Sequence, residues 1–282
     1  YSFNYQNWYS AVEFESKNTT KNVGLFELSP FSKYEIKGKK AHSELQRLCT
    51  ANIKNEVGRS TYTQMLNESA GIETDLTVIS INENHFRIIS GAAVREHDKH
   101  HILKHLSKDL EFNDVTDDLI CLGIFGPKSR DLLSKISADN FSNENFKFGT
   151  GKFIKIHTKK VWAQRLSYVG ELGFEIYINH DDAKEIYQLI IEEGKNHNLS
   201  HCGAHTMDTM RMESGFLHWG HDISPEENQY EAGLKFAISY KKEIDFIGKK
   251  SLLKINDNNK NKKFVMLSLN NNEAGNPLLL HE

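Results

Sequence analysis

A β-hairpin between residues 62 and 90 restricts the fold of this chain more than any other feature. Two runs rich in β-branched residues, 76–81 and 86–89, flank a polar turn at 82–85, which is typical of two antiparallel strands. Asp75 stands where the first strand begins, although a carboxylate is a poor strand former. A turn or cap is the ordinary place for such an aspartate, so Asp75 alone does not define a site.

A second stretch, residues 165–178, places another carboxylate inside a β pattern. A glycine-containing turn at residues 170–173 separates two β runs. In the second run, Glu175 and Tyr177 share one face and the apolar residues share the other. A wet face tolerates a glutamate at little cost, whereas a dry face requires a partner for it, and both interpretations stay open.

Composition and charge limit the class of protein. The chain has 282 residues, 38% hydrophobic and 10% aromatic, which predicts a globular chain with a sizeable core. Lys and Arg number 35 against 38 Asp and Glu, the signs are interspersed, and the net charge is -3. Without a basic stripe we expect no nucleic acid partner. Because no apolar run approaches about 18 residues and no signal peptide is visible, we expect no membrane segment and a cytoplasmic location.

The cysteines and the chain ends carry two further expectations. Cys49, Cys121 and Cys202 are odd in number, far apart and outside any motif, which favours a reducing compartment over disulfides or a thiolate metal site. The sequence begins at Tyr1 without Met and stops in mid-pattern at Glu282. We therefore expect a piece of a longer polypeptide.

Histidines at helical spacing raise the question of a metal site. His97, His101 and His105 recur every fourth residue in a predicted helix, and three histidines on one face can bind a transition metal. No carboxylate joins them in the manner of zinc proteases, and lysines lie among them, so we predict a solvated helix face. For His218 and His221 we predict capping or packing, because a third ligand is missing. The sequence predicts no metal site.

The remaining pattern is a mixture of helices and strands. Residues 126–129, Gly-Pro-Lys-Ser, lack the glycine spacing of a phosphate loop and instead begin a helix. The predicted helices are 11–22, 40–50, 95–106, 127–136, 183–194, 204–214 and 246–251. The other predicted strands are 23–28, 31–36, 119–125, 153–157, 161–166, 174–178, 233–239 and 264–269. A polar, Asn- and Lys-rich linker at 257–263 is the best candidate boundary.

Four motifs, in this order and spacing, carry a resemblance to a known family. They are Gly71-Ile-Glu-Thr-Asp75-Leu after Tyr62, Gly126-Pro-Lys-Ser, Ser167-Tyr168-x-Gly170-Glu-x-Gly173-Phe-Glu175-Ile, and Arg211-Met-Glu213-Ser-Gly215. From about residue 23 onward the chain resembles the folate-binding module of the glycine-cleavage T-protein (aminomethyltransferase) family. Its aromatic opening, with Trp8, resembles the branch in which this module is fused behind an FAD-dependent dimethylglycine or sarcosine dehydrogenase domain.

The resemblance implies an α+β fold of two interleaved α/β subdomains around a central cavity. Residues 1–256 would form the folate-binding domain, with subdomain one roughly 1–32 and 118–199, and subdomain two roughly 33–117 and 200–256. Residues 257–282 would be a linker and the truncated start of a C-terminal β-barrel.

The resemblance also implies roles for individual side chains. Glu175 would accept the two adjacent donors of a pterin ring, with Tyr62 and Tyr168 lining that ring. Arg211 would orient a carboxylate or meet the folate tail. Asp75 falls on the position of the family's catalytic aspartate, where it would position a proton and offset positive charge.

One position departs from the family pattern. Where the T-protein has an asparagine beside the pterin, the same register here has Gly91, which removes a hydrogen-bonding side chain. This departure suits the dehydrogenase-fused branch better than a stand-alone T-protein.

The function implied by the resemblance is tetrahydrofolate-dependent methylene transfer from a methylamine-derived imine, giving 5,10-methylenetetrahydrofolate. FAD would belong only to an upstream dehydrogenase domain. The alternatives are a stand-alone aminomethyltransferase with a lipoyl-carried donor, a related sulfonium demethylase, and an interaction domain without a ligand. A non-catalytic folate-binding protein of iron–sulfur assembly is disfavoured, because its Lys-Gly-Cys-Tyr-x-Gly-Gln-Glu signature is replaced by His221-Asp-Ile-Ser-Pro-Glu-Glu.

Overall fold

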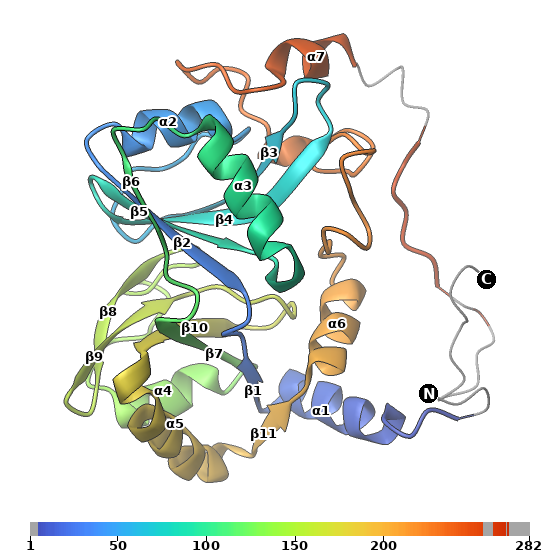
Figure 1. Ribbon diagram of the computed structural model, residues 1–282. Coiled ribbons are helices and arrows are strands. Elements are labelled where there is room, and N and C mark those ends of the chain that lie inside the picture. Colours follow the sequence, from blue (N-terminus) through green and yellow to red (C-terminus); the bar gives the residue numbers. More distant parts are fainter. Residues whose placement is uncertain (1–4, 256–261, 269, 271–282) are drawn as a thin grey trace.

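Two β-sheets form the framework of the protein (Figure 1). The computed structural model describes residues 5–255, 262–268 and 270. The six-stranded sheet has the order β11-β1-β7-β10-β9-β8, with bounds Leu199–Cys202, Val23–Glu27, Leu119–Phe125, Gly173–Asn179, Lys159–Gln164 and Gly151–Ile156. The five-stranded sheet has the order β3-β4-β5-β2-β6, with bounds Ser60–Leu66, Ile72–Asn82, His85–Ser90, Ser32–Lys37 and Glu111–Asp114.

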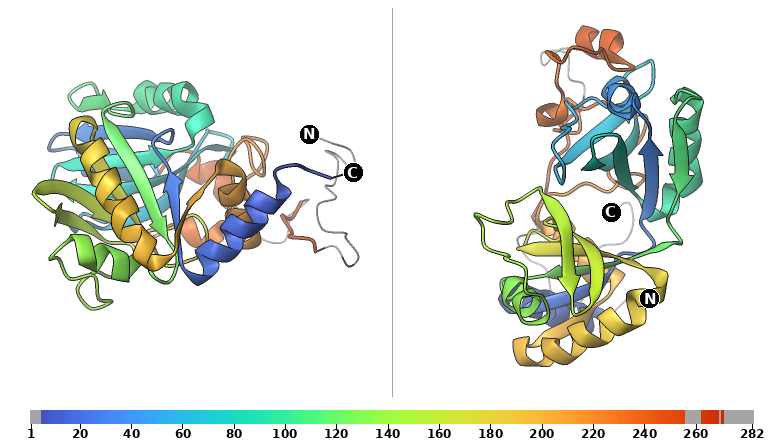
Figure 2. Two further views of the ribbon diagram at one scale, coloured as in Figure 1. Left: turned by 90° about the horizontal axis from the view of Figure 1, so that it is seen from below. Right: turned by 90° about the vertical axis from the view of Figure 1, so that its left-hand side faces the viewer.

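The helices of the described residues are α1 (Tyr9–Lys21), α2 (Ala41–Leu48), α3 (Arg95–His105), α4 (Ser129–Ile136), α5 (His180–Gly194), α6 (Ala204–Glu213) and α7 (Lys249–Lys254). Helices α4 and α5 lie against one face of the six-stranded sheet, and α2 and α3 lie against one face of the five-stranded sheet (Figure 2). Apolar residues of α4 and α5 share a buried cluster with the six-stranded sheet, and those of α2 and α3 share one with the five-stranded sheet. Helices α1 and α6 pack together beside β11.

The chain passes between the sheets more than once. Strand β1 lies in the six-stranded sheet, β2–β6 form the five-stranded sheet, and β7–β11 return to the first. The segment after α6 then packs against β3 and β4, where Leu217 and Phe246 share a cluster with Leu66 and Ile72. The predicted α+β class is confirmed. The subdomain boundaries and the central cavity stay predictions.

The hairpin that dominates the sequence forms as predicted. Strands β4 and β5 pair antiparallel, with Leu76 opposite Ser90 and Ile79 opposite Arg87. Alternation along β4 sends Leu76 into the core beneath α2 and α3, while Ile79 joins a cluster shared with the six-stranded sheet. Asp75 lies four residues before Ile79 on β4, so both side chains point to the same face of the strand. That face lies between the two sheets.

Two predicted strands are wrong, and three observed strands were not predicted. Residues 233–239 contain a turn at Gly233, whose φ is 74°, followed by the 3-10 helix η3, Lys235–Ala237. Residues 264–268 have exposed side chains and no strand, and residue 269 lies outside the described part. Strands β3, β6 and β11 were missed because β3 is rich in polar residues and the other two have only four residues each.

Helix α3 also differs from its prediction. His101 is buried and its ring lies 4.9 Å from that of His105, so the histidine face is not fully solvated. Burial lowers the pKa of His101 to about 4, which keeps its ring neutral at pH 7. The underlying reason is that α3 packs on β4 across this face. The described residues contain no cluster of three or more His, Cys, Asp or Glu arranged to hold a metal ion.

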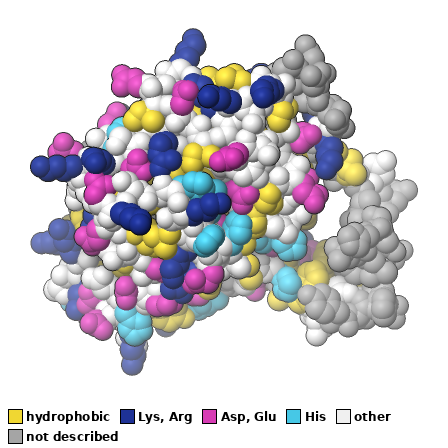
Figure 3. Space-filling model, turned by 45° about the horizontal axis from the view of Figure 1, so that its top comes forward, with side chains coloured by type: hydrophobic (Ala, Val, Ile, Leu, Met, Phe, Trp, Pro, Cys, Tyr) yellow, Lys and Arg dark blue, Asp and Glu magenta, His cyan; other side chains and the backbone are white. Residues whose placement is uncertain are grey.

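Surface and interior agree with the dispersed charge of the sequence. Figure 3 shows acidic and basic side chains interspersed over the face it draws, with several histidines gathered near its middle.

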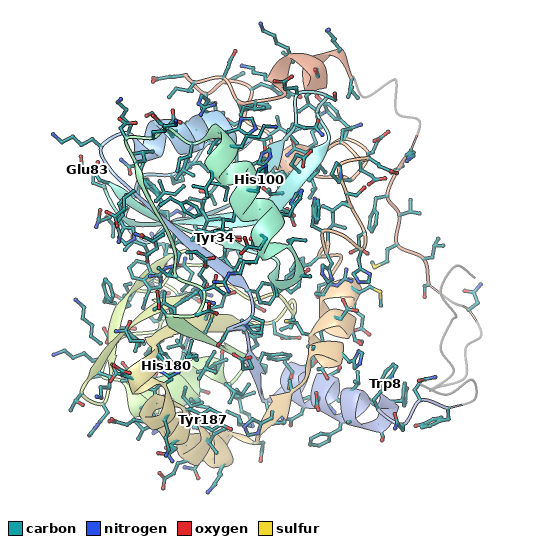
Figure 4. The ribbon with its side chains drawn as sticks, in the orientation of Figure 1. Trp8, Tyr34, Glu83, His100, His180 and Tyr187 are labelled. Carbon is teal, nitrogen blue, oxygen red and sulfur yellow. The ribbon has the colours of Figure 1, made fainter. Side chains whose placement is uncertain are left out.

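Cys49, Cys121 and Cys202 are all free thiols. Tyr34, near the centre of Figure 4, is fully buried and donates its hydroxyl to the carbonyl of Arg95 at 2.6 Å. Within the described ranges, no helix has the length and apolar character needed to span a membrane.

Candidate functional site

Asp75 occupies a half-buried position on β4, next to β3. Its cross-strand neighbour is Gln64, whose Nε2 donates to Asp75 Oδ1 at 2.7 Å. Burial raises the pKa of Asp75 to about 6, and Asp98 adds to the rise, while hydrogen bonds from Gln64 and Tyr62 oppose it. A carboxyl group with a pKa this close to neutrality can both hold and release a proton under ordinary conditions.

An aromatic pair stands on the solvent side of Asp75. Tyr62, two residues before Gln64 on β3, is 36% exposed, and its ring stacks on that of Phe236 at 6.2 Å. Phe236 is 76% exposed, which is unusual for a phenylalanine. Burial of its hydroxyl and the charge of Asp75 raise the pKa of Tyr62, so this phenol stays protonated and available as a donor. Phe236 escaped prediction because η3 was interpreted as a strand.

Tyr168 lies between β9 and β10, close enough to Asp75 for the two groups to interact electrostatically. Burial raises the pKa of Tyr168, the charge of Arg211 lowers it, and the charge of Asp75 raises it. Its hydroxyl donates to the carbonyl of Leu217 at 2.6 Å, and its ring stacks on Phe216 at 6.0 Å. The structure thus brings Tyr62, Asp75 and Tyr168 together.

Arg211 is committed to other protein groups. It is buried on α6, and its Nε donates to Asp208 Oδ1 at 2.7 Å. It also donates to Asp222 and to the carbonyl of Phe216. These contacts use most of the five donors of a guanidinium. Arg211 therefore fixes the turn after α6, and a contact with a ligand would have to share or replace one of these bonds.

Glu175 is half-buried on β10 and has a different neighbourhood. The hydroxyl of Tyr177 donates to Glu175 Oε2 at 2.6 Å, and burial raises the pKa of Glu175. Tyr177 belongs to the cluster between the sheets that also contains Ile79. Since Glu175 shares the face of Tyr177, and Asp75 that of Ile79, both carboxylates belong to facing surfaces of the two sheets. Of the two interpretations left open for Glu175, the structure favours the dry face with a partner.

Gly91 follows β5 directly, one position beyond the pair formed by Ser90 and Leu76. It therefore lies beside Asp75 in the continuation of this ladder. Its φ of -59° is available to any residue. A Cβ at this position would lie 3.1 Å from Cγ2 of Val94, so a side chain requires a small shift of Val94.

Three polar residues near Asp75 were missed by the sequence. Thr50, Gln64 and Gln229 are each 0% exposed and hydrogen-bonded to one another. Gln64 gave no signal, because β3 was not predicted as a strand. Gln229 carries none, because the chain must fold before it approaches β3.

The fold and the site together define an α+β domain of two interleaved sheets with carboxylates on their facing surfaces. The structure of the glycine cleavage system aminomethyltransferase T from Bartonella henselae matches it with a TM-score of 0.77 and 25% identity, over 86% of this chain and 65% of that chain. The model of the GCVT N-terminal domain family matches residues 1–242. The chain belongs to this family, as its motifs predicted.

Relatives in longer proteins resemble the chain more closely in sequence. It is 36% identical to 4-methylaminobutanoate oxidase (formaldehyde-forming) of Paenarthrobacter nicotinovorans, over 100% of this chain and 34% of that protein. It is 34% identical to mitochondrial dimethylglycine dehydrogenase of Rattus norvegicus, over 95% of this chain and 32% of that protein. The chain thus spans about a third of the length of these curated relatives. It is an aminomethyltransferase-like domain related to demethylating dehydrogenases.

Proposed function

We propose that the chain transfers a one-carbon unit at the methylene level from a methylamine-derived imine to tetrahydrofolate, as the folate module of a dimethylglycine or sarcosine dehydrogenase-like enzyme. The observation that carries the proposal is Asp75, a carboxyl group with a pKa of about 6 set among Tyr62, Gln64 and Tyr168. The relatives whose names specify N-methylated amines support the same donor class.

The residues present fit tetrahydrofolate. A carboxylate has about four acceptor positions, and Glu175 accepts one described bond, from Tyr177. It therefore keeps capacity for the two adjacent donors of a pterin, at about 1.5–3 kcal/mol for each charge-assisted bond. Tyr62 and Phe236 offer aromatic faces that remain partly in solvent, where a flat ring can stack.

When bound, tetrahydrofolate supplies the nucleophilic nitrogen that accepts the one-carbon unit. Asp75 would hold the proton lost from that nitrogen and offset the positive charge of the donor. Tyr62 and Tyr168 would exclude water and orient the ring, with Arg211 fixing the turn that holds Tyr168 or meeting the folate tail. An upstream FAD-dependent dehydrogenase domain would produce the imine, and confinement would raise its effective concentration at Asp75.

Folinic acid binding and single-turnover transfer test the proposal. We expect the chain to bind folinic acid in a calorimetric titration and to accelerate methylene transfer from formaldehyde to tetrahydrofolate. Asp75→Asn should retain binding and reduce the transfer rate about 100-fold or more, as expected for loss of a general acid–base group. No binding of folinic acid, or an unchanged rate in Asp75→Asn, would refute the assignment.

A stand-alone aminomethyltransferase is the second candidate, and the match to aminomethyltransferase T favours it. The two differ in the donor. A lipoyl-bound aminomethyl group should serve the second candidate and not the first, so rates with the two donors separate them.

A further inference from the structure

A chain of buried hydrogen bonds leads from the interior of the five-stranded sheet to Asp75. The amide Nε2 of Gln229 donates to Thr50 Oγ1 at 2.9 Å and to Gln64 Oε1 at 2.5 Å. Nε2 of Gln64 then donates to Asp75 Oδ1 at 2.7 Å. Burying three polar side chains is costly unless each is satisfied, and apolar residues would fill the same space at lower cost.

The hydrogen bonds of this series all run in one direction, toward Asp75. The Thr50 hydroxyl donates to the carbonyl of Ala237 at 3.1 Å, so its oxygen is free to accept from Gln229. Both side-chain amide hydrogens of Gln229 are then donated. The side-chain oxygen Oε1 of Gln64 must therefore face Gln229 to accept one of them. Consequently the NH2 group of Gln64 faces Asp75. The reverse orientation would set the Gln64 carbonyl against the Asp75 carboxylate, with two acceptors in contact.

Gln229 Oε1 strengthens this argument. It is buried and has no hydrogen-bond partner among the described residues. Leaving such an atom unsatisfied is unfavourable, and most buried polar atoms avoid it. Gln229 therefore adopts an orientation in which its two donated bonds, to Thr50 and to Gln64, outweigh its unpaired oxygen. These bonds also fix the orientation of Gln64.

The backbone holds the same residues in place. The backbone N–H of Thr50 donates to the backbone carbonyl of Gln64 at 2.9 Å. The backbone N–H of Ser239 donates to the backbone carbonyl of Thr50 at 3.0 Å. Thr50 thus joins β3 to the segment that carries Gln229 and Phe236. The position of that segment and the orientation of the donor at Asp75 are linked through one residue.

We propose that Gln64 and Gln229 are positioning residues, which present a fixed hydrogen-bond donor to Asp75 and thereby favour its ionised form. Protonated Asp75 needs an acceptor instead, which would require both amides to turn over. The importance of this device for catalysis rests on the proposed function, whereas its effect on Asp75 does not.

Three further groups interact with Asp75, namely Tyr62, Asp98 and Tyr168. Tyr62 on β3 donates to its carboxylate, and Asp98 on α3 raises its pKa by repulsion. Tyr168, between β9 and β10, is coupled to Asp75 and to Arg211. Because none of these groups belongs to the amide chain, substitutions of Gln64 and Gln229 leave them in place.

Carboxyl carbon NMR of selectively 13C-labelled aspartates tests the inference on the full chain without folate. The Asp75 signal is assigned by its loss in Asp75→Asn, and its pKa is read from a pH titration. We expect Gln64→Met to raise the pKa of Asp75 by about one pH unit, because a donor to the charged form is lost. Gln229→Met should raise it by a smaller amount, because Gln64 stays near Asp75 but is free to turn.

Gln46→Met is the matched control. Gln46 is also a buried glutamine, on α2, and its Nε2 donates to Asn52 Oδ1 at 2.7 Å and to the Ile53 carbonyl at 3.0 Å. It should leave the pKa of Asp75 unchanged. If Gln229→Met does not fold, Thr50→Val replaces it, since it removes the acceptor of Gln229 and should also raise the pKa of Asp75.

An unchanged pKa of Asp75 in Gln64→Met, or in Gln229→Met, would overturn the inference. An equal rise in Gln46→Met would do so as well, because the effect would then reflect general loosening. Since this titration uses no folate, its failure is distinguishable from failure of the proposed function. That function fails if the wild-type chain neither binds folinic acid nor transfers the methylene group.

Discussion

Asp75 and Glu175 are both half-buried carboxylates inside β-sheets, yet their surroundings differ. Asp75 receives hydrogen bonds from Gln64 and Tyr62 and lies next to an exposed aromatic pair. Glu175 receives its bond from Tyr177 on the same strand and is ion-paired with no described residue. Burial raises both pKa values.

Burial of a carboxyl group is unfavourable at both positions, yet it serves a different purpose at each. Near Asp75 burial raises the pKa of the carboxyl group to about 6 and two hydrogen-bond donors limit the rise, which suits proton transfer. Near Glu175 one neutral donor leaves most acceptor positions of the carboxylate available, which suits recognition of a donor pair. We therefore propose that Asp75 handles the proton and that Glu175 recognises the ligand.

Removing Glu175 should have the largest effect on ligand binding. We expect Glu175→Ala to weaken folinic acid binding by about 2 kcal/mol or more, roughly 30-fold, through loss of charge-assisted bonds. Isothermal titration calorimetry measures it. Glu171→Ala, which removes a carboxylate from the preceding turn, serves as the control. Equal affinity of Glu175→Ala and the wild type would remove Glu175 from the site and end the division of roles.

Neutralising Asp75 should stabilise the fold in a pH-dependent way. The pKa of Asp75 is about 6 in the folded chain, whereas an unfolded aspartate has a pKa of about 3.9. The folded state therefore holds its proton more tightly, and stability is lost as pH rises from about 4 to about 6.

At pH 8 the free energy of unfolding of Asp75→Asn should exceed that of the wild type by about 2 kcal/mol, and at pH 4 the two should nearly coincide. Urea unfolding at both pH values measures the difference. Asp118→Asn, at an exposed aspartate, should show neither effect. A wild type more stable than Asp75→Asn at pH 8 would contradict the assignment of burial as the dominant cause.

The two carboxylates also mark how far sequence reasoning reaches. Local alternation predicted the hairpin of β4 and β5 and placed Glu175 and Tyr177 on one face, because both follow from a period of two residues. The motifs predicted the family, which the comparisons confirm. Residue roles carried by the resemblance stay predictions.

Nonlocal contacts were beyond the sequence. Gln229 meets Gln64 across 165 positions, and no local pattern indicates such a pairing. Arg211 was expected beside a ligand, but its acidic partner Asp222 approaches it only after the turn that follows α6 has formed. Phe236 was hidden by an apolar run that resembles a strand, although Gly233 has a positive φ that starts a turn.

The hydroxyl of Tyr177 offers a subtler test of the Glu175 side. Tyr177→Phe keeps the ring, over which the Arg87 guanidinium lies at 5.3 Å, and removes the hydroxyl that donates to Glu175. Loss of this donor should raise the pKa of Glu175 further and remove one bond that holds its carboxylate, so folinic acid binding should weaken by about 1 kcal/mol, roughly fivefold.

Because a raised pKa favours the protonated form of Glu175, the loss should become smaller as calorimetry is repeated at increasing pH. Tyr187→Phe, at an exposed tyrosine of α5, controls for loss of a phenolic hydroxyl elsewhere. A loss that does not change with pH would show that Tyr177 acts through packing rather than through the charge of Glu175.

Gly91 should have the smallest effect, and it sharpens the Asp75 side of the comparison. Gly91→Asn restores the amide expected from the T-protein pattern, at a φ of -59° that asparagine adopts without strain. One added neutral hydrogen bond predicts tighter folinic acid binding by about 0.5 kcal/mol. Gly91→Ala adds the Cβ that meets Val94 without the amide, so it should bind no more tightly than the wild type. If both variants weaken binding equally, the space beside Asp75 is itself required by the ligand, and the absence of a side chain at residue 91 is what distinguishes this site from one that carries asparagine.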